Sequence, residues 1–250
     1  MEKLIGILGA MSQEIDEVID ILEDKESYNY GSRIYYKGKI NGTSVVVAFS
    51  KWGKVAATIT VTTLIEHFHI SELIFIGTAG ALADDLRVGD VVVANRLIQH
   101  DMDVRPILKR FEVPLLDKIS LDADKRMSEE AYNAVKQLLD RGIEHIFEED
   151  VIKEFDLENP RVIYGDIASG DQFINDDEKR KELLRCLPGL GCVEMEGAAV
   201  AQVCFEYKMP FCVIRIISDT ANHNANCDFG RFITFVSCTY IKAIINDLVR

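Results

Sequence analysis

The sequence predicts an α/β domain with a largely parallel β-sheet and helices on its faces. Two observations predict this class: apolar runs long enough for buried strands recur along the chain, and segments with helical periodicity separate several of them. A length of 250 residues suits one large domain, because single α/β domains of this size are common. We therefore expect residues 1–250 to form a single domain around one core.

The six apolar runs predict buried strands, because a strand that is covered on both faces is apolar along its length. In chain order they are Leu4–Leu8, Ser44–Phe49, Leu73–Gly77, Val91–Leu97, Val162–Ala168 and Phe211–Ser218. Apolar residues recurring at helical spacing predict helices between and after them. These are Ser12–Leu22, Lys54–His67, Ser128–Asp140, Gly197–Tyr207 and Phe229–Leu248.

Two segments interrupt this pattern. Asp103–Asp124 contains Pro106 and Pro114 with mixed charge, and it predicts a long loop of the lid or binding type. Glu144–Glu158 holds seven acidic residues and one lysine, and it predicts a solvated excursion from the fold.

Composition excludes several classes of function. A formal charge of −13 argues against nucleic acid as a partner, because phosphate binding needs clustered lysine and arginine. No run of 18 apolar residues is present, so we expect no membrane span. The six cysteines form no C-x-x-C pair and most lie in apolar runs, which favours reduced thiols and a cytoplasmic location. A small molecule is the expected partner.

Polar residues stand where predicted strands end, which is where open α/β sheets bind ligands. The Gly9-Ala10-Met11 turn precedes a helix that carries Glu14, and a helix N-terminus of this kind favours anions. The alternative is that Ser12 caps the helix and Glu14 only complements its dipole. Both interpretations are open at this point.

Two further segments follow apolar runs. Gly77-Thr78-Ala79-Gly80-Ala81 would let a ligand lie against the backbone beside the Thr78 hydroxyl, or it forms a tight turn. Ser169–Ile174 places Phe173 where an aromatic face and free main-chain groups could bind a flat heterocycle. Core packing of Phe173 is the alternative.

Three carboxylates form the most informative set: Glu194, Glu196 and Asp219. Carboxylates that converge on one cleft supply an acid for a leaving group, a base for water and negative charge near an oxocarbenium-like sugar, as glycosidic bond cleavage requires. The alternative is that Glu194 and Glu196 are helix N-terminal acids and Asp219 is an N-cap.

His100-Asp101-Met102-Asp103 contains metal-ligating residue types. It has one histidine and no second cluster at ligand spacing, so we expect no metal site. We also expect no cofactor.

Eight motifs in order resemble the 5′-methylthioadenosine/S-adenosylhomocysteine nucleosidases of the nucleoside phosphorylase superfamily, over nearly the whole chain. They are Gly9-Ala10-Met11 with Glu14, Ser50 with Gly53–Ala57, Gly77–Leu82, Val88–Val92, His100-Asp101 with Asp103, Ser169–Asp171 with Phe173-Ile174, Val193–Glu196, and Ser218-Asp219. The resemblance implies a mixed, partly barrel-like central sheet flanked by helices, a homodimer, and hydrolysis of an N-glycosidic bond that releases adenine and a 5-thioribose.

The resemblance also implies roles for individual residues. Asp219 resembles the general acid at adenine N7, and Glu14 resembles the base that orients the attacking water, with Arg215 beside it to keep it ionised. The expected substrate contacts are Met195 and Glu196 at the ribose, Phe173 and Ile174 at adenine, Thr78 in place of the usual serine, and Met11, Trp52 and Phe229 around the ribose and 5′-alkylthio end.

Three features depart from the family pattern. Trp52 stands where a smaller aliphatic residue is typical, and residues 104–111 lack the usual Gly- and Tyr-rich character, so the 5′-substituent preference is open. Glu144–Glu158 resembles an insertion.

Three other functions compete with hydrolysis of methylthioadenosine. A phosphorylase would need fixed cations or N–H donors for phosphate, whereas the Gly9–Gln13 turn has no arginine and Glu14 would repel the anion. A nucleosidase for futalosine derivatives shares the adenine end. A nucleoside-binding protein without turnover would be expected to lack Glu14 or Asp219.

Overall fold

The computed structural model describes residues 3–221 and 225–250, with ten strands in one mixed sheet. The strands are β1 Ile5–Gly9, β2 Glu23–Tyr30, β3 Arg33–Ile40, β4 Thr43–Phe49, β5 Glu72–Ala81, β6 Val91–Gln99, β7 Leu121–Asp122, β8 Val162–Ser169, β9 Leu190–Glu194 and β10 Phe211–Asp219. The helices are α1 Ser12–Asp20, α2 Lys54–Phe68, α3 Lys125–Asp140, α4 Glu149–Glu154, α5 Asp177–Cys186, α6 Gly197–Tyr207, α7 Ala225–Phe232 and α8 Cys238–Leu248.

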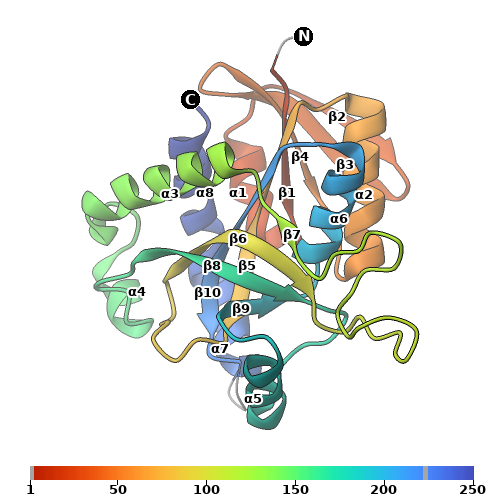
Figure 1. The fold of residues 1–250 in the computed structure, drawn as a ribbon. Coiled ribbons are helices and arrows are strands. Elements are labelled where there is room, and N and C mark those ends of the chain that lie inside the picture. Colours follow the sequence, from red (N-terminus) through yellow and green to blue (C-terminus); the bar gives the residue numbers. More distant parts are fainter. Residues whose placement is uncertain (1–2, 222–224) are drawn as a thin grey trace.

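Five strands close into a barrel. The order is β10, β6, β8, β9, β5, and β5 pairs with β10 to complete the ring. The β10–β6 and β9–β5 pairs are antiparallel, and the other three are parallel. From β5 the sheet continues through β1, β4, β3 and β2 (Figure 1). This arrangement confirms the mixed, partly barrel-like sheet.

Helices cover the sheet on two sides. In Figure 1, α1, α3 and α8 lie on one side, and α2 and α6 lie on the other. Neighbouring residues of one strand face opposite cores: Ile7 packs with Ile15 and Val18 of α1, whereas Leu8 packs in the cluster that holds residues of α2 and α6. Burial on both faces explains why these strands read as continuous apolar runs.

Several elements differ from the sequence-based expectations. The tight-turn alternative for Gly77–Ala81 is wrong, because β5 continues through these residues to Ala81. The expected helix Phe229–Leu248 is interrupted by a π-helical segment at Ile233–Ser237. The sequence also did not predict the β2–β3 hairpin, strand β9 or helix α5.

The acidic segment Glu144–Glu158 is not a solvated excursion. It forms a 3₁₀ turn and α4, and it buries Phe147, Ile152 and Leu157 in the core cluster that contains α3 and α8. Its carboxylates lie on the outer side, where Glu154 pairs with Arg231. The high charge of this segment therefore obscured its apolar face in the sequence, although the segment is amphipathic.

Candidate active site

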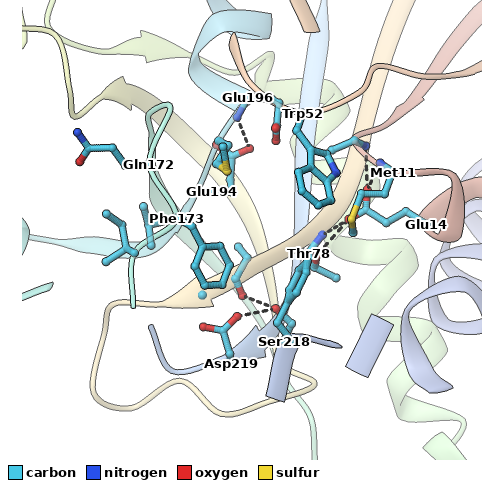
Figure 2. A pocket seen from close by; sticks show the side chains of 17 residues that line it. Met11, Glu14, Trp52, Thr78, Gln172, Phe173, Glu194, Glu196, Ser218 and Asp219 are labelled. Carbon is cyan, nitrogen blue, oxygen red and sulfur yellow. Dashed lines mark hydrogen bonds between the residues drawn. The ribbon is translucent and has the colours of Figure 1, made fainter. Parts of the chain in front are cut away.

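A cavity of about 410 Å³ opens where β1, β5, β9 and β10 end. Figure 2 shows its lining side chains. Ten of the predicted site residues line it: Met11, Glu14, Trp52, Thr78, Phe173, Ile174, Met195, Glu196, Asp219 and Phe229. The eleventh, Arg215, lies behind the wall and contacts Glu194.

Glu14 is buried at the N-terminus of α1, and its carboxylate is held on both oxygens. Oε2 accepts hydrogen bonds from the Ala10 and Met11 amides at 2.8 and 3.0 Å. Oε1 accepts from the Thr78 amide at 2.9 Å and the Thr78 hydroxyl at 3.0 Å. Met11, not Ser12, occupies the N-cap position of α1, so the capping alternative for Ser12 is wrong.

The protonation of Glu14 is set by opposing effects. Burial raises the pKa of Glu14 above its ordinary value, while the Arg215 charge and the three backbone hydrogen bonds lower the pKa. The expected influence of Arg215 is therefore present, but burial outweighs it. Glu14 holds a proton more readily than an exposed glutamate.

Two glycines of β5 make room for carboxylates. A Cβ atom on Gly77 would come within 2.8 Å of Glu14 Oε1, and one on Gly80 would come within 2.9 Å of Asp219 Oδ1. Real Cβ atoms do not approach other atoms so closely without displacement. The small residues of this motif thus allow two acidic side chains to approach one strand.

Asp219 is buried at the end of β10, where the register with β5 shifts between Ile217 and Asp219. Its Oδ1 accepts a hydrogen bond from the Ala221 amide at 2.8 Å, and its Oδ2 accepts one from the Ser218 hydroxyl at 2.9 Å. Here Asp219 and Ser218 form one end of the cavity (Figure 2).

Glu194 serves as a structural anchor at the N-terminus of α6. It accepts hydrogen bonds from the amides of Glu196 and Gly197 and from the Ser169 hydroxyl. Arg215, 1% exposed, donates to Glu194 Oε2 at 2.8 Å, and its guanidinium carbon lies 4.0 Å from the Phe75 ring centroid. The helix N-terminal alternative is correct for Glu194.

Glu196 has a different environment two residues away. Its Oε1 accepts a hydrogen bond from the Gly53 amide at 2.7 Å. Burial, reinforced by the charge of Glu194, raises the pKa of Glu196 to about 8. A buried carboxylate with a raised pKa on a cavity wall is a candidate for ligand contact.

The remaining walls are mainly apolar. Phe173 and Phe229 lie edge to face with ring centroids 5.8 Å apart. Met11 and Ile174 are buried, whereas Phe173 and Trp52 are 43% and 65% exposed at the rim. Figure 2 shows Trp52 next to Met11, across the cavity from Gln172. An apolar cavity with a few convergent polar groups is typical of small-molecule sites.

Some lining residues were absent from the predicted set. Ser218 and Val193 were part of quoted motifs without a role, and Gln172 precedes Phe173 in a third motif. Each of these three residues adjoins a predicted site residue or a carboxylate near a strand end, and that adjacency was the sequence signal that could have identified it. His100 instead lies buried, and a Cβ on Gly170 would come within 2.5 Å of its ring. Among the residues that the structure describes, no group of three or more His, Cys, Asp or Glu could hold a metal ion.

Residues 4–239 match the model of the phosphorylase superfamily. The chain is 38% identical to an aminodeoxyfutalosine nucleosidase of Helicobacter pylori, over 99% of this chain and 100% of that protein. It is 34% identical to a 5′-methylthioadenosine/S-adenosylhomocysteine nucleosidase of Shewanella denitrificans, over 98% and 99% of the two chains. Each of these matches covers nearly the whole length of both chains.

Solved structures match equally fully. A futalosine hydrolase of Helicobacter pylori superposes with a TM-score of 0.84 at 32% identity, covering 99% of this chain and 97% of that one. A Neisseria meningitidis 5′-methylthioadenosine/S-adenosylhomocysteine nucleosidase in complex with methylthio-immucillin-A superposes with a TM-score of 0.86 at 29% identity, covering 99% and 98%. The chain therefore belongs to the 5′-methylthioadenosine/S-adenosylhomocysteine nucleosidase family of the nucleoside phosphorylase superfamily.

Proposed function

We propose that the protein is a purine nucleosidase that hydrolyses the N-glycosidic bond of 5′-substituted adenosines. Water adds its oxygen to C1′ of the ribose and gives a proton to Glu14. The bond from C1′ to adenine N9 breaks, and Asp219 gives a proton to N7 of the departing adenine. The products are adenine and the 5-substituted ribose.

The position of Glu14 carries this proposal. The amides of Ala10 and Met11 form the kind of anion site that a phosphorylase would use for phosphate. Glu14 Oε2 already accepts a hydrogen bond from each of these amides, at 2.8 and 3.0 Å, so neither N–H group is free for phosphate. A phosphate dianion would meet a carboxylate instead of free donors, whereas a water molecule could donate to that carboxylate. Hydrolysis is favoured over phosphorolysis on this ground.

Asp219 is suited to protonate the leaving group. General acid catalysis typically contributes 10² to 10⁴-fold to a rate, and adenine departs poorly as an anion. The Ser218 hydroxyl and Ala221 amide fix the orientation of the carboxyl group at one end of the cavity. Phe173 next to it offers a ring for stacking on adenine, with the main chain at Ile174 available to its edge.

Glu196 is the proposed acceptor for the ribose hydroxyls. Its carboxylate lines the cavity, and the Gly53 amide is its hydrogen-bond donor on the protein side. Met195 is proposed to contact the sugar, with Met11, Trp52 and Phe229 around the 5′-substituent. Thr78 supports Glu14 through its hydroxyl.

The proposed substrates are 5′-methylthioadenosine and S-adenosylhomocysteine. A second candidate is aminodeoxyfutalosine, favoured by the 38% identity to the Helicobacter pylori nucleosidase named for it. All three present adenine and ribose to the carboxylates, and they differ in the group that would lie toward Trp52.

We also propose a homodimer in the cytoplasm. The support is an exposed apolar strip on α2 and α6, with Val55, Ile59 and Tyr207 at its surface next to the loop that carries Trp52. Light scattering of the purified protein would test the dimer.

No helix within residues 3–221 and 225–250 has the length and apolarity for a membrane crossing.

Free adenine measured by chromatography tests the substrate proposal. The purified protein is incubated with each of the three nucleosides, and kcat/KM is compared, because this ratio expresses discrimination between competing substrates. We expect release from at least one 5′-thio nucleoside. Release from aminodeoxyfutalosine alone would establish the second candidate, and release from none would contradict the proposed function.

A further inference from the structure

Two separate walls of the cavity meet at Asp101, which itself lies outside the cavity lining. The first is the turn before α2 that carries Trp52 and Gly53, and the second is the segment after β8 that carries Phe173. Asp101 Oδ1 accepts a hydrogen bond from Lys54 Nζ at 2.7 Å, and its Oδ2 accepts one from the Asp171 amide at 3.0 Å. One carboxylate thus joins both segments.

Asp171 adds a second link between the same segments. Its Oδ1 accepts a hydrogen bond from the Lys54 amide at 2.8 Å, which provides a cap for the first turn of α2. Lys54 Nζ also donates to Gln99 Oε1 at 3.2 Å. The Lys54 and Asp101 side chains are only 19% and 16% exposed, so this pair is shielded from solvent more than ordinary surface ion pairs.

Gly53 is held between this network and the cavity. Its φ is +90°, and a Cβ atom there would lie 2.9 Å from Asp171 Oδ1. On its other side the Gly53 amide donates to Glu196 Oε1 at 2.7 Å. Movement of Lys54 and Asp171 would therefore carry the amide away from Glu196.

We propose that Asp101 is a positioning residue: through Lys54 and Asp171 it holds the Gly53 amide on Glu196 and holds Trp52 at the mouth of the cavity. Asp101 lies outside the cavity lining, so we do not expect it to touch the substrate. It fixes the carboxylate that receives the ribose hydroxyls and the wall that faces the 5′-substituent. The kinetic consequences rest on the proposed nucleosidase function, while the structural consequence does not.

The pH dependence follows from the groups around Glu196. Burial raises the pKa of Glu196 most, Glu194 beside it and Glu14 of α1 raise it further, and the Gly53 amide and Arg215 of β10 lower it. Loss of the amide alone leaves the three charges in place and moves the pKa of Glu196 upward from about 8. Ionised Glu196, the better acceptor for hydroxyls, would then form only at higher pH.

Asp101→Asn tests the proposal, because it removes the charge that Lys54 binds and keeps the side-chain size. We expect KM to rise about tenfold with a smaller change in kcat, since contacts made equally in the ground and transition states affect KM. We also expect the rise of kcat/KM with pH to shift upward. Asp24→Asn is the matched control, because Asp24 forms an exposed Lys–Asp pair with Lys39 on the β2–β3 hairpin.

Trp52 supplies a readout that needs no substrate, because it is the only tryptophan of the chain. In Asp101→Asn we expect lower fluorescence anisotropy and stronger acrylamide quenching of Trp52 than in the wild type or in Asp24→Asn. If no nucleoside is hydrolysed, the proposed function fails, and the fluorescence still decides whether Asp101 positions this turn.

Lys54→Met removes the same ion pair from the other side and covers the case in which Asp101→Asn does not fold. We expect the two single variants and the double variant to show nearly equal changes in KM and in Trp52 anisotropy, because an interaction that both residues share can be lost only once. A folded Asp101→Asn or Lys54→Met protein with unchanged Trp52 anisotropy, KM and pH profile would overturn the proposal, as would fully additive defects.

Discussion

The carboxylate side of the cavity and its aromatic mouth are built in different ways. Glu14 is buried at the N-terminus of α1 and Asp219 at the end of β10, and backbone amides hold their oxygens. Trp52 and Phe173 stand on segments outside the strands and are 65% and 43% exposed. The strands and α1 therefore fix the groups proposed for the chemistry, while Trp52, proposed to face the 5′-substituent, and Phe173, proposed to stack on adenine, lie at the rim.

This difference suggests why relatives named for different nucleosides share one fold. The ribose and the bond to be broken would meet the carboxylates that the strand ends and α1 hold. The 5′-substituent would meet side chains that can change without moving a strand, such as Trp52. Functional residues on loops of a rigid scaffold commonly vary in this way.

Substitution of Asp219 would remove the chemistry while leaving the mouth intact. For Asp219→Asn we expect kcat for adenine release to fall by about 10² to 10⁴-fold, because the side chain can no longer donate an acidic proton. Nucleoside binding measured by calorimetry should persist. A variant that keeps more than about a tenth of the wild-type kcat would be incompatible with Asp219 as the general acid.

Removal of Arg215 tests whether the carboxylate side depends on its buried anchor. Arg215→Met leaves Glu194 buried without its cation, and breaking a buried pair typically costs about 3–5 kcal/mol of unfolding free energy. Urea denaturation would measure the loss. Arg105→Met, which breaks the exposed pair with Asp103, should cost about 1 kcal/mol or less. Equal midpoints for the two variants would contradict the assignment of Glu194 as an anchor.

The pH dependence of stability distinguishes Glu196 from an ordinary surface acid. The folded protein raises the pKa of Glu196 from 4.5 to about 8. Between these two pKa values the native state keeps a proton on Glu196 that the unfolded chain releases. The stabilising contribution of Glu196 to the free energy of unfolding is therefore fully present below pH 4.5 and is lost as pH rises through about 8.

Glu196→Gln removes this titration. As pH rises from 5 to 8, we expect the urea midpoint of Glu196→Gln to increase relative to that of the wild type, even though ribose binding weakens. Parallel pH profiles for the two proteins would show that Glu196 titrates normally.

Trp52→Ala addresses the mouth and should have the smallest effect. Because the side chain is 65% exposed, we expect KM for 5′-methylthioadenosine to rise by about 3- to 10-fold with kcat nearly unchanged. The ratio of kcat/KM values among the three nucleosides should change as well. A loss in kcat comparable to that of Asp219→Asn would mean that the mouth takes part in the chemistry.

The buried strands and the carboxylates at strand ends could be predicted from the sequence for one physical reason. Strands covered on both faces are uniformly apolar, so an acidic residue at the end of one, such as Asp219, is conspicuous. The resemblance added the roles of these residues.

Other features have no comparable local signal. Strand β2 is largely exposed and polar, so its pairing with β3 left no apolar pattern. Gly77 and Gly80 are typical of a turn, yet both lie within β5 and leave room for two carboxylates, which only their spatial neighbours reveal. The contacts of Asp101 join residues 54, 101 and 171, which no short motif connects.

The phosphate dependence of adenine release would decide whether the protein cleaves the glycosidic bond with water or with phosphate. The purified protein is incubated with 5′-methylthioadenosine in phosphate-free buffer and again with added phosphate, and the products are separated by chromatography. Because Glu14 occupies the amides that would bind phosphate, we expect equal rates in both buffers and free methylthioribose as the sugar product. Release that requires phosphate and yields the sugar 1-phosphate would contradict this expectation.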